Sequence, residues 1–312
     1  MDRTDETDPE FDSFARRMGA VFGEDGRRWM GELPDRLAAA AARWDLALGE
    51  PVARLSFNYV TAATTAAGER IILKLGVPRD ELRCEIDALR LYDGRSAVRL
   101  LDADAAEGAL LLERLEPGAR LKTLFPERDE EATAIAAGLM RRIWHAPPPG
   151  HSFPHVSSWI AGLADLRPHY GGTTGPFPAR LVDQAERLFA ELLADPHPPV
   201  VLHGDMNHEN MLSAEREPWL VIDPKGVIGE PEYEVGALIR NPQPIYQDFR
   251  DMGRLQSRRL DMLAEQLGFD RQRLWAWSFA QLILSMWWNV EDGAPFTGQR
   301  DLAVAEVLSG LG

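Results

Sequence analysis

The sequence has a single cysteine, Cys84, in 312 residues, so no disulfide can form within the chain. A chain without disulfides fits a reducing cytosol. A secretory signal is also missing: Met1 to Glu10 is acidic and polar, whereas a signal begins with basic and then apolar residues. We therefore expect a cytoplasmic protein.

Long apolar runs are equally scarce. The nearest candidate for a membrane span is Leu274 to Val290, and Gln281, Ser285 and Asn289 interrupt it. These polar residues favour a buried helix over a membrane span. We therefore expect no membrane partner.

Positive charge is in short supply, with 34 Lys and Arg residues against 49 Asp and Glu residues and a net charge of −15. This balance disfavours a nucleic-acid backbone as the partner and is compatible with a small cationic substrate. A requirement for solubility alone would also explain it. The sequence leaves the oligomeric state open.

Lysine occurs only three times, and Lys74 lies inside an apolar strand predicted for 70–75. Charged side chains are rarely buried without a partner, so Lys74 needs a carboxylate. An amphipathic helix predicted over 80–92 offers Glu85 beside its apolar stripe, with Glu81 one turn earlier. The alternative is an ordinary edge-strand lysine and a solvated glutamate.

The most informative stretch is His203-Gly204-Asp205, which follows an apolar run and is predicted to lie in a loop. Asn210 stands five residues after Asp205. Two short strands, 211–212 and 219–222, follow, and a turn at 214–217 joins them. If these strands form a hairpin, Asn210 and Asp223 lie opposite one another at its open end, beside Asp205.

Amide and carboxylate oxygens are the ligands that Mg²⁺ prefers, so Asn210 and Asp223 are candidate metal ligands. Asp205 is a separate carboxylate that can orient a hydroxyl nucleophile. The set therefore fits phosphoryl transfer from a nucleotide. The alternative is that these residues only shape turns, where Asp and Asn are common.

The pattern His-x-Asp-x-x-x-x-Asn, a hairpin and then Asp resembles the catalytic and metal loops of the protein-kinase-like fold. His-Gly-Asp-x-x-x-x-Asn is the form used by aminoglycoside phosphotransferases. With Ile222-Asp223-Pro224-Lys225-Gly226, Tyr233 to Leu238 and Arg240-Asn241-Pro242, the chain resembles the streptomycin 6-kinase and hydroxyurea phosphotransferase family from about Leu55 to Asp292.

The resemblance implies a two-lobed, protein-kinase-like α+β fold. Residues 1–113 would form a small antiparallel-sheet lobe, and residues 114–312 a larger, mostly helical lobe. ATP is the implied nucleotide, with GTP not excluded, and the backbone near Glu113 to Leu115 would bind adenine. Ser56-Phe57-Asn58 stands where the fold places its nucleotide-covering loop, although it lacks Gly-x-Gly-x-x-Gly and a plain hairpin is the alternative.

The resemblance also implies a role for each site residue. Asp205 would accept or orient the substrate hydroxyl, His203 would support the loop, and Asn210 and Asp223 would hold Mg²⁺. Lys74, paired with Glu85, would position the phosphates.

In the resembling fold, an acidic residue at the position of Glu234 is buried under the catalytic loop. Lys225 would neutralise charge near the metal, although this inference is weaker.

The implied acceptor is a cationic aminoglycoside, most simply streptomycin phosphorylated at its 6-hydroxyl. Hydroxyurea or another small metabolite is the alternative, as is a partner-binding module that binds nucleotide but has lost catalysis. Trp288-Asn289 and Glu291-Asp292 stand where this family closes the substrate cleft, and an acidic, aromatic wall would attract a guanidinium. A solvated helix end is the alternative for these residues.

Periodicity and breaker residues predict the remaining elements. Further strands are expected at 52–55, 59–64, 97–102 and 109–112. Helices are expected at 11–22, 35–48, 130–145, 157–166, 179–194, 248–267, 271–290 and 301–311.

Overall fold

The computed structural model describes residues 9–52, 55–242, 251–293 and 299–312. The chain forms two compact units. The first comprises the described residues up to Ile86 together with Val98–Arg114, and the second comprises Asp87–Ala97 together with the described part of Leu115–Gly312. The predicted division into lobes of residues 1–113 and 114–312 stays a prediction.

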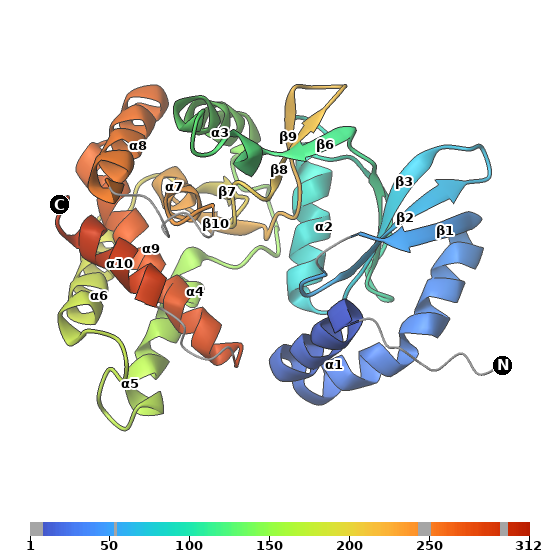
Figure 1. The fold of residues 1–312 in the computed structure, drawn as a ribbon, viewed down its shortest axis with the longest axis horizontal. Coiled ribbons are helices and arrows are strands. Elements are labelled where there is room, and N and C mark those ends of the chain that lie inside the picture. The colour runs from blue at the N-terminus through green and yellow to red at the C-terminus, as the bar shows by residue number, and fades with distance from the viewer. Residues whose placement is uncertain (1–8, 53–54, 243–250, 294–298) are drawn as a thin grey trace. The chain divides into compact units, whose positions relative to one another are not determined.

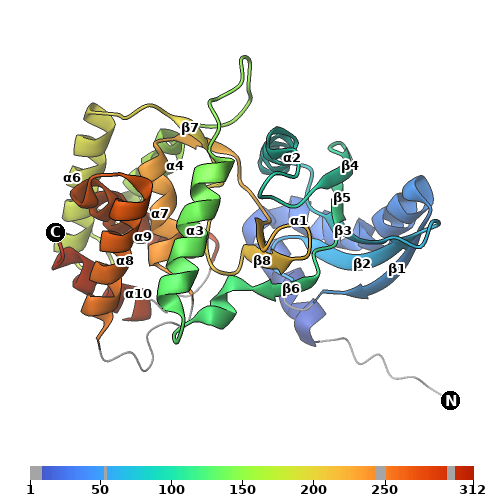
Figure 2. The same cartoon turned by 90° about the horizontal axis from the view of Figure 1, so that it is seen from above.

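The first unit is built on a five-stranded antiparallel sheet in the order β1-β2-β3-β5-β4 (Figures 1 and 2). Its strands are β1 (Leu46–Pro51), β2 (Tyr59–Thr65), β3 (Arg70–Leu75), β4 (Leu100–Asp104) and β5 (Ala109–Glu113). β3 is central and is paired on both edges, with β2 and with β5. The side chains of Ile71, Leu73 and Leu75 on this strand are buried, as its apolar sequence predicts.

Helix α1 (Pro9–Trp44) replaces the two separate helices predicted at 11–22 and 35–48. The helix kinks at Gly23, whose φ of 61° lies in the left-handed region, and then continues. It ends at Trp44, and the residues that follow form β1 because they pair with β2. Strand pairing therefore overrides the local helical propensity that extended the prediction to Leu48.

The strand predicted at 52–55 is wrong. Neither Val52 nor Leu55 lies in a strand, and residues 53–54 lie outside the described residues. The edge strand is β1, which precedes this segment.

The core of the first unit joins α1 to the sheet. Buried side chains of α1 pack with those of β3, and each such side chain contributes roughly 1.5–3 kcal/mol by leaving water. The main members are Phe14, Met18, Trp29 and Leu33 from α1 and Leu73 and Leu75 from β3. This packing supports the strand that carries Lys74.

Helix α2 spans Asp80–Tyr92, as predicted, and its stripe of Leu82, Ile86 and Leu89 is buried. β4 begins at Leu100 and not at Ala97. Ala97 instead forms a parallel bridge with Val221, so the first residues of the predicted strand pair elsewhere.

The second unit contains two small antiparallel sheets. In one, β6 (Pro117–Arg120), β8 (Met211–Ala214) and β9 (Trp219–Val221) lie in the order β6-β8-β9. In the other, β7 (Val200–Leu202) pairs with β10 (Val227–Gly229). β6 and β10 escaped prediction because each is only a few residues long and contains glycine, which weakens a strand signal.

Helices make up most of the second unit (Figure 1). The α-helices are α3 (Asp129–Ile143), α4 (Val156–Ala161), α5 (Leu166–His169), α6 (Ala179–Ala194), α7 (Val235–Ile239), α8 (Met252–Leu267), α9 (Arg271–Glu291) and α10 (Gln299–Ser309). Short 3₁₀ turns are η1 (Leu121–Leu124), η2 (Gly162–Asp165) and η3 (Pro231–Glu234). The helix predicted at 157–166 is thus broken into α4, η2 and the start of α5, and residues 248–250 of another predicted helix lie outside the described residues.

Helix α9 is the centre of this unit and contacts α6, α7, α8 and α10. It is buried over nearly its whole length, including Trp277 and Trp287, which explains a helix that is apolar on all faces. The predicted buried helix at 271–290 is confirmed. Within the described residues, none of the helices is both long enough and apolar enough to cross a membrane.

A buried ion pair joins α3 to α8, which lie side by side (Figure 2). The Arg259 guanidinium donates to the Asp129 carboxylate from Nε at 3.1 Å, and both side chains are almost fully buried. Arg259 also donates from Nη1 to the Asn241 carbonyl at 2.8 Å. Arg258 Nη2 also donates to Asp129 Oδ2 at 3.0 Å, but its side chain is 38% exposed. Removing Arg259 therefore leaves a buried carboxylate whose charge is only partly compensated.

We therefore expect Arg259→Ala to lower the free energy of unfolding by about 3 kcal/mol, the lower end of the cost of breaking a buried pair, because Asp129 loses its fully buried partner and keeps the more exposed Arg258. Urea denaturation followed by circular dichroism measures the change. Arg254→Ala on the same helix, whose side chain is 83% exposed, is the matched control and should change stability little. A loss below about 1 kcal/mol in Arg259→Ala would show that the pair does not hold the two helices together.

Candidate active site

The loop between β7 and β8 carries His203, Asp205 and Asn210. It leaves β7 through Gly204, whose φ is 84°. A Cβ on this residue would lie 2.9 Å from Trp159 Cη2 and 3.1 Å from Lys225 Cβ, closer than side chains normally pack. Glycine is therefore required here both by the backbone conformation and by the close approach of Trp159.

Glu234 holds the start of this loop. Its side chain is fully buried, and its two carboxylate oxygens accept the backbone N–H groups of His203 at 2.7 Å and Gly204 at 2.9 Å. Burial raises the pKa of the Glu234 carboxyl to about 7, because the loss of hydration outweighs the support of the two donors for the ionised form. The structure places Glu234 under the loop that carries His203 and Asp205, where the resemblance puts a buried acidic residue.

His203 ties the loop to the hairpin that follows. Its Nε2 lies 2.8 Å from the Ile222 carbonyl, and the Asp205 N–H donates to its Nδ1 at 3.3 Å. Burial lowers the pKa of the imidazole, which favours the neutral ring with the proton on Nε2. Because the ring is fully buried, His203 supports the loop through these two bonds.

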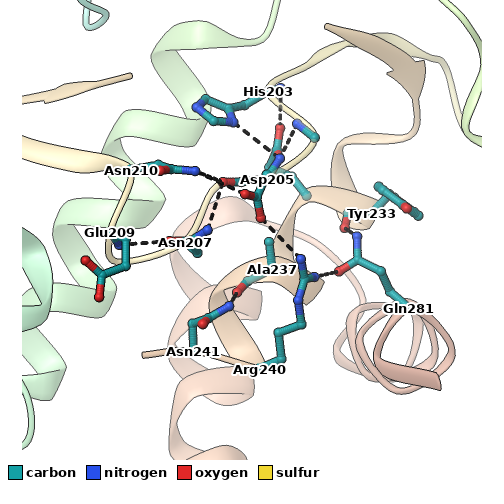
Figure 3. A network of polar contacts seen from close by, with 12 residues as sticks. His203, Asp205, Asn207, Glu209, Asn210, Tyr233, Ala237, Arg240, Asn241 and Gln281 are labelled. Atoms are coloured by element: carbon teal, nitrogen blue, oxygen red, sulfur yellow. Dashed lines mark hydrogen bonds and ion pairs between the residues drawn. The ribbon is translucent and has the colours of Figure 1, made fainter. Parts of the chain in front are cut away.

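The Asp205 carboxylate is held from two sides (Figure 3). Asn210 Nδ2 donates to Oδ2 at 3.1 Å, and Arg240 Nη2 donates to Oδ1 at 3.2 Å. Asn210 Nδ2 also lies 2.9 Å from the Asp205 carbonyl oxygen. The Asp205 side chain remains 28% exposed, so a reactant can approach a carboxylate whose orientation is already set.

The register of the hairpin corrects one prediction. Met211 pairs with Val221, and the Ile222 N–H donates to the Asn210 carbonyl at 2.9 Å, so Asn210 faces Ile222. The predicted pairing of Asn210 with Asp223 is wrong by one residue. Asp223 comes directly after this pair with a left-handed φ of 65°, a conformation that Asp tolerates better than most residues.

In the first unit, Lys74 and Glu85 form the predicted ion pair. Lys74 Nζ lies 2.6 Å and 2.7 Å from the two carboxylate oxygens of Glu85, and both side chains are buried. The alternative of an edge-strand lysine is excluded, because β3 is central in its sheet. Two short bonds in a buried setting fix the position of the ammonium.

The other predicted nucleotide residues are less distinctive in their contacts. Ser56 and Asn58 lie in the bend before β2, and the Asn58 amide oxygen fills the space where a Cβ on Gly76 would sit. The Glu113 N–H donates to the Arg99 carbonyl at 3.0 Å, and Leu115 is half-buried. A nucleotide role for these four residues stays a prediction.

Two residues of the site were missed by sequence reasoning. In the sequence, Arg240, at the end of α7, stands out only as part of a family motif, and Gln281 of α9 only as a polar residue that interrupts an apolar run. Arg240 Nη1 donates to Gln281 Oε1 at 2.8 Å, so Gln281 is linked to Asp205 through Arg240 (Figure 3). The available signal was a glutamine inside an otherwise apolar helix, since a buried amide needs partners.

The end of α9 brings Trp288 near the loop through Trp159 and gathers acidic groups around Glu291. The Trp288 ring packs edge-on against Trp159 at 5.8 Å between centroids, and Trp159 in turn lies against Gly204. Partial burial raises the pKa of Glu291, and the negative charges of Asp165 and Asp292 raise it further. The structure therefore gathers the predicted Glu291 and Asp292 and adds Asp165, which the sequence did not indicate.

Comparison with known proteins gives a consistent result. Residues 43–293 match the family model described as aminoglycoside/hydroxyurea antibiotic resistance kinase. The chain is 34% identical to a streptomycin 6-kinase of Streptomyces griseus, covering 96% of each chain. It is 36% identical to a hydroxyurea phosphotransferase of Kitasatospora aureofaciens, covering 96% of this chain and 89% of that one.

Among solved structures, an aminoglycoside phosphotransferase in ternary complex with ADP and hygromycin B superposes with a TM-score of 0.62 and 14% identity, covering 88% of this chain and 96% of that chain. That likeness confirms the predicted α+β, protein-kinase-like fold class. The family match and the two relatives also identify the family of the chain. The chain belongs to the aminoglycoside/hydroxyurea antibiotic resistance kinase family and is a phosphotransferase that acts on a hydroxyl group.

Proposed function

We propose that this protein transfers the γ-phosphate of ATP to a hydroxyl of an aminoglycoside, with streptomycin, phosphorylated at its 6-hydroxyl, as the favoured acceptor. The observation that carries the proposal is the Asp205 carboxylate, oriented by Asn210 and Arg240 yet still open to a reactant. A carboxylate in this state accepts the hydroxyl proton as the acceptor oxygen attacks phosphorus.

The donor set fits a magnesium ion. Asn210 uses its Nδ2 to hold Asp205, which leaves its Oδ1 as the amide atom for a cation, and Asp223 follows with a carboxylate. Both are hard oxygen ligands. We infer that these two residues hold Mg²⁺, which when bound neutralises charge on the phosphate oxygens.

Lys74 is the residue assigned to the phosphates. Its ammonium is a compact charge, and Glu85 fixes its position with bonds of 2.6 Å and 2.7 Å. The ADP in the related solved structure supports an adenine nucleotide as the donor. Backbone groups near Glu113 and Leu115 are assigned to adenine, and Ser56 and Asn58 to the segment covering the phosphates.

Electrostatics favours a cationic acceptor. Asp165, Glu291 and Asp292 gather near aromatic rings that reach the catalytic loop, and the chain as a whole carries a net charge of −15. Streptomycin has guanidinium groups that such a field attracts. Hydroxyurea is small and neutral, so this field helps it little, and the similarity to a hydroxyurea phosphotransferase is what keeps it as the second candidate.

Asp205→Asn should lower turnover by about 10²–10⁴-fold, because the amide keeps the shape of the side chain but cannot take the hydroxyl proton. Binding of ATP should be unchanged, since Asp205 acts on the acceptor. Coupled ATP-consumption assays and calorimetry measure the two effects. The matched control is Glu191→Gln on the exposed face of α6, which should behave as wild type. Turnover near the wild-type value in Asp205→Asn would remove Asp205 from its assigned role.

Asp223→Asn should weaken nucleotide binding only when magnesium is present, because it removes a charged oxygen ligand from a divalent ion. Titration calorimetry with ADP, in magnesium and in EDTA, separates the two conditions. The affinity in EDTA serves as the internal control for folding. An unchanged magnesium dependence would contradict the assignment of Asp223 as a ligand.

A panel of aminoglycosides, hydroxyurea and neutral sugars, assayed with ATP, should show streptomycin gaining one phosphoryl group ahead of the others. The acidic groups around Glu291 attract its guanidinium groups, so added salt should raise its apparent KM by screening. Product mass and fragmentation identify the phosphorylated acceptor and position. Turnover confined to hydroxyurea or to an anionic acceptor would overturn the acceptor assignment and leave the phosphotransferase assignment standing.

A further inference from the structure

Arg240 lies beside the proposed catalytic carboxylate, although its position in the chain is 35 residues away. Its Nη2 is 3.2 Å from Asp205 Oδ1, and its side chain is 13% exposed. Asn210 meets the other oxygen of the same carboxylate at 3.1 Å (Figure 3). Asp205 is therefore held through both oxygens by two donors that come from different segments.

We propose that Arg240 is a positioning residue for phosphoryl transfer, which fixes the plane of the Asp205 carboxylate and is itself held in place by Gln281. The proposal rests on the proposed function, in which Asp205 receives the acceptor hydroxyl. Arg240 acts through Asp205 and does not itself touch the acceptor or the phosphates.

Gln281 determines where the guanidinium sits. Its Oε1 accepts from Arg240 Nη1 at 2.8 Å, and its Nε2 donates to the Tyr233 carbonyl at 3.3 Å, so both ends of the amide have defined partners. The side chain is buried, and a Cβ on Gly236 would lie only 2.0 Å from Gln281 Oε1. Because Gly236 has no side chain, Gln281 of α9 has room to contact Arg240. Arg240 in turn contacts Asp205, so the packing of α9 influences the position of the Asp205 carboxylate.

The geometry explains why an arginine suits this position. Two different nitrogens of one planar group reach two acceptors, Gln281 on one side and Asp205 on the other. A lysine has one nitrogen and no fixed fork, so it cannot reproduce both directions. An ionised carboxylate has about four acceptor sites, so one bond from Arg240 and one from Asn210 leave sites open for the hydroxyl proton of the acceptor.

Orientation of this kind affects the chemical step more than binding. Misplacing a catalytic group by about 1 Å can cost about 10²-fold in rate. We therefore expect Arg240→Ala and Arg240→Lys to lower kcat by about 10- to 100-fold, with the KM for ATP changing less than about twofold. Gln281→Leu should give a smaller loss of kcat, because Arg240 keeps its charge and loses only the hydrogen bond to Gln281 that orients its guanidinium.

The decisive measurement is a double-mutant cycle between Arg240→Ala and Asp205→Asn, using the acceptor that wild type turns over and product mass for the slow variants. If Arg240 acts through Asp205, Arg240→Ala should change the residual rate of Asp205→Asn by less than about twofold. Gln281→Leu should likewise add little to Arg240→Ala. Nucleotide-induced thermal shifts confirm that each variant is folded, and Arg254→Ala on the surface of α8 is the matched arginine control.

Each outcome is distinguishable. Full additivity of Arg240→Ala and Asp205→Asn, a main effect on the KM for ATP, or a kcat for Arg240→Lys equal to that of wild type would overturn the proposal and leave the proposed function intact. A folded wild type that transfers no phosphoryl group to any acceptor would overturn the proposed function, and this proposal with it.

Discussion

The loop that carries His203, Asp205 and Asn210 depends on one buried carboxylate, that of Glu234. The N–H groups of His203 and Gly204 come directly after β7, and Glu234 accepts both of them. Left without an acceptor, two buried N–H groups would each carry a desolvation cost of about 1–3 kcal/mol. Burying a carboxylate is also unfavourable, and it raises the Glu234 pKa to about 7. The two charge-assisted bonds offset part of that cost and give the loop a defined starting point.

From that starting point, two polar groups of the site are held by partners from other segments. His203 contacts the Ile222 carbonyl, and Asp205 contacts Arg240 at the end of α7, next to the buried helix α9. The orientation of the Asp205 carboxylate therefore depends on helix packing as well as on the loop. The acidic groups assigned to the acceptor come from η2 and from the end of α9, apart from the loop. Such a division allows one fold to serve different acceptors.

Sequence alone determined those features that depend on short-range geometry. The spacing of Asp205 and Asn210 within one loop brings them into contact because a short loop cannot carry them far apart. The position of Glu85 beside the apolar stripe of α2 predicted its pairing with Lys74, since the helix period fixes which residues share a face. The buried helix at 271–290 followed from its apolar composition for the same local reason.

Tertiary structure alone decided how distant segments meet. Pairing with β2 turned residues 46–48 from predicted helix into the first part of β1, and the hairpin register placed Asn210 opposite Ile222 where Asp223 was expected. Arg240 and Gln281 became part of the site only because α7 packs on α9, with Gly236 leaving room between them. Local periodicity predicts which face of a helix or strand is buried. Which other helix or strand packs against that face depends on the packing of the whole chain.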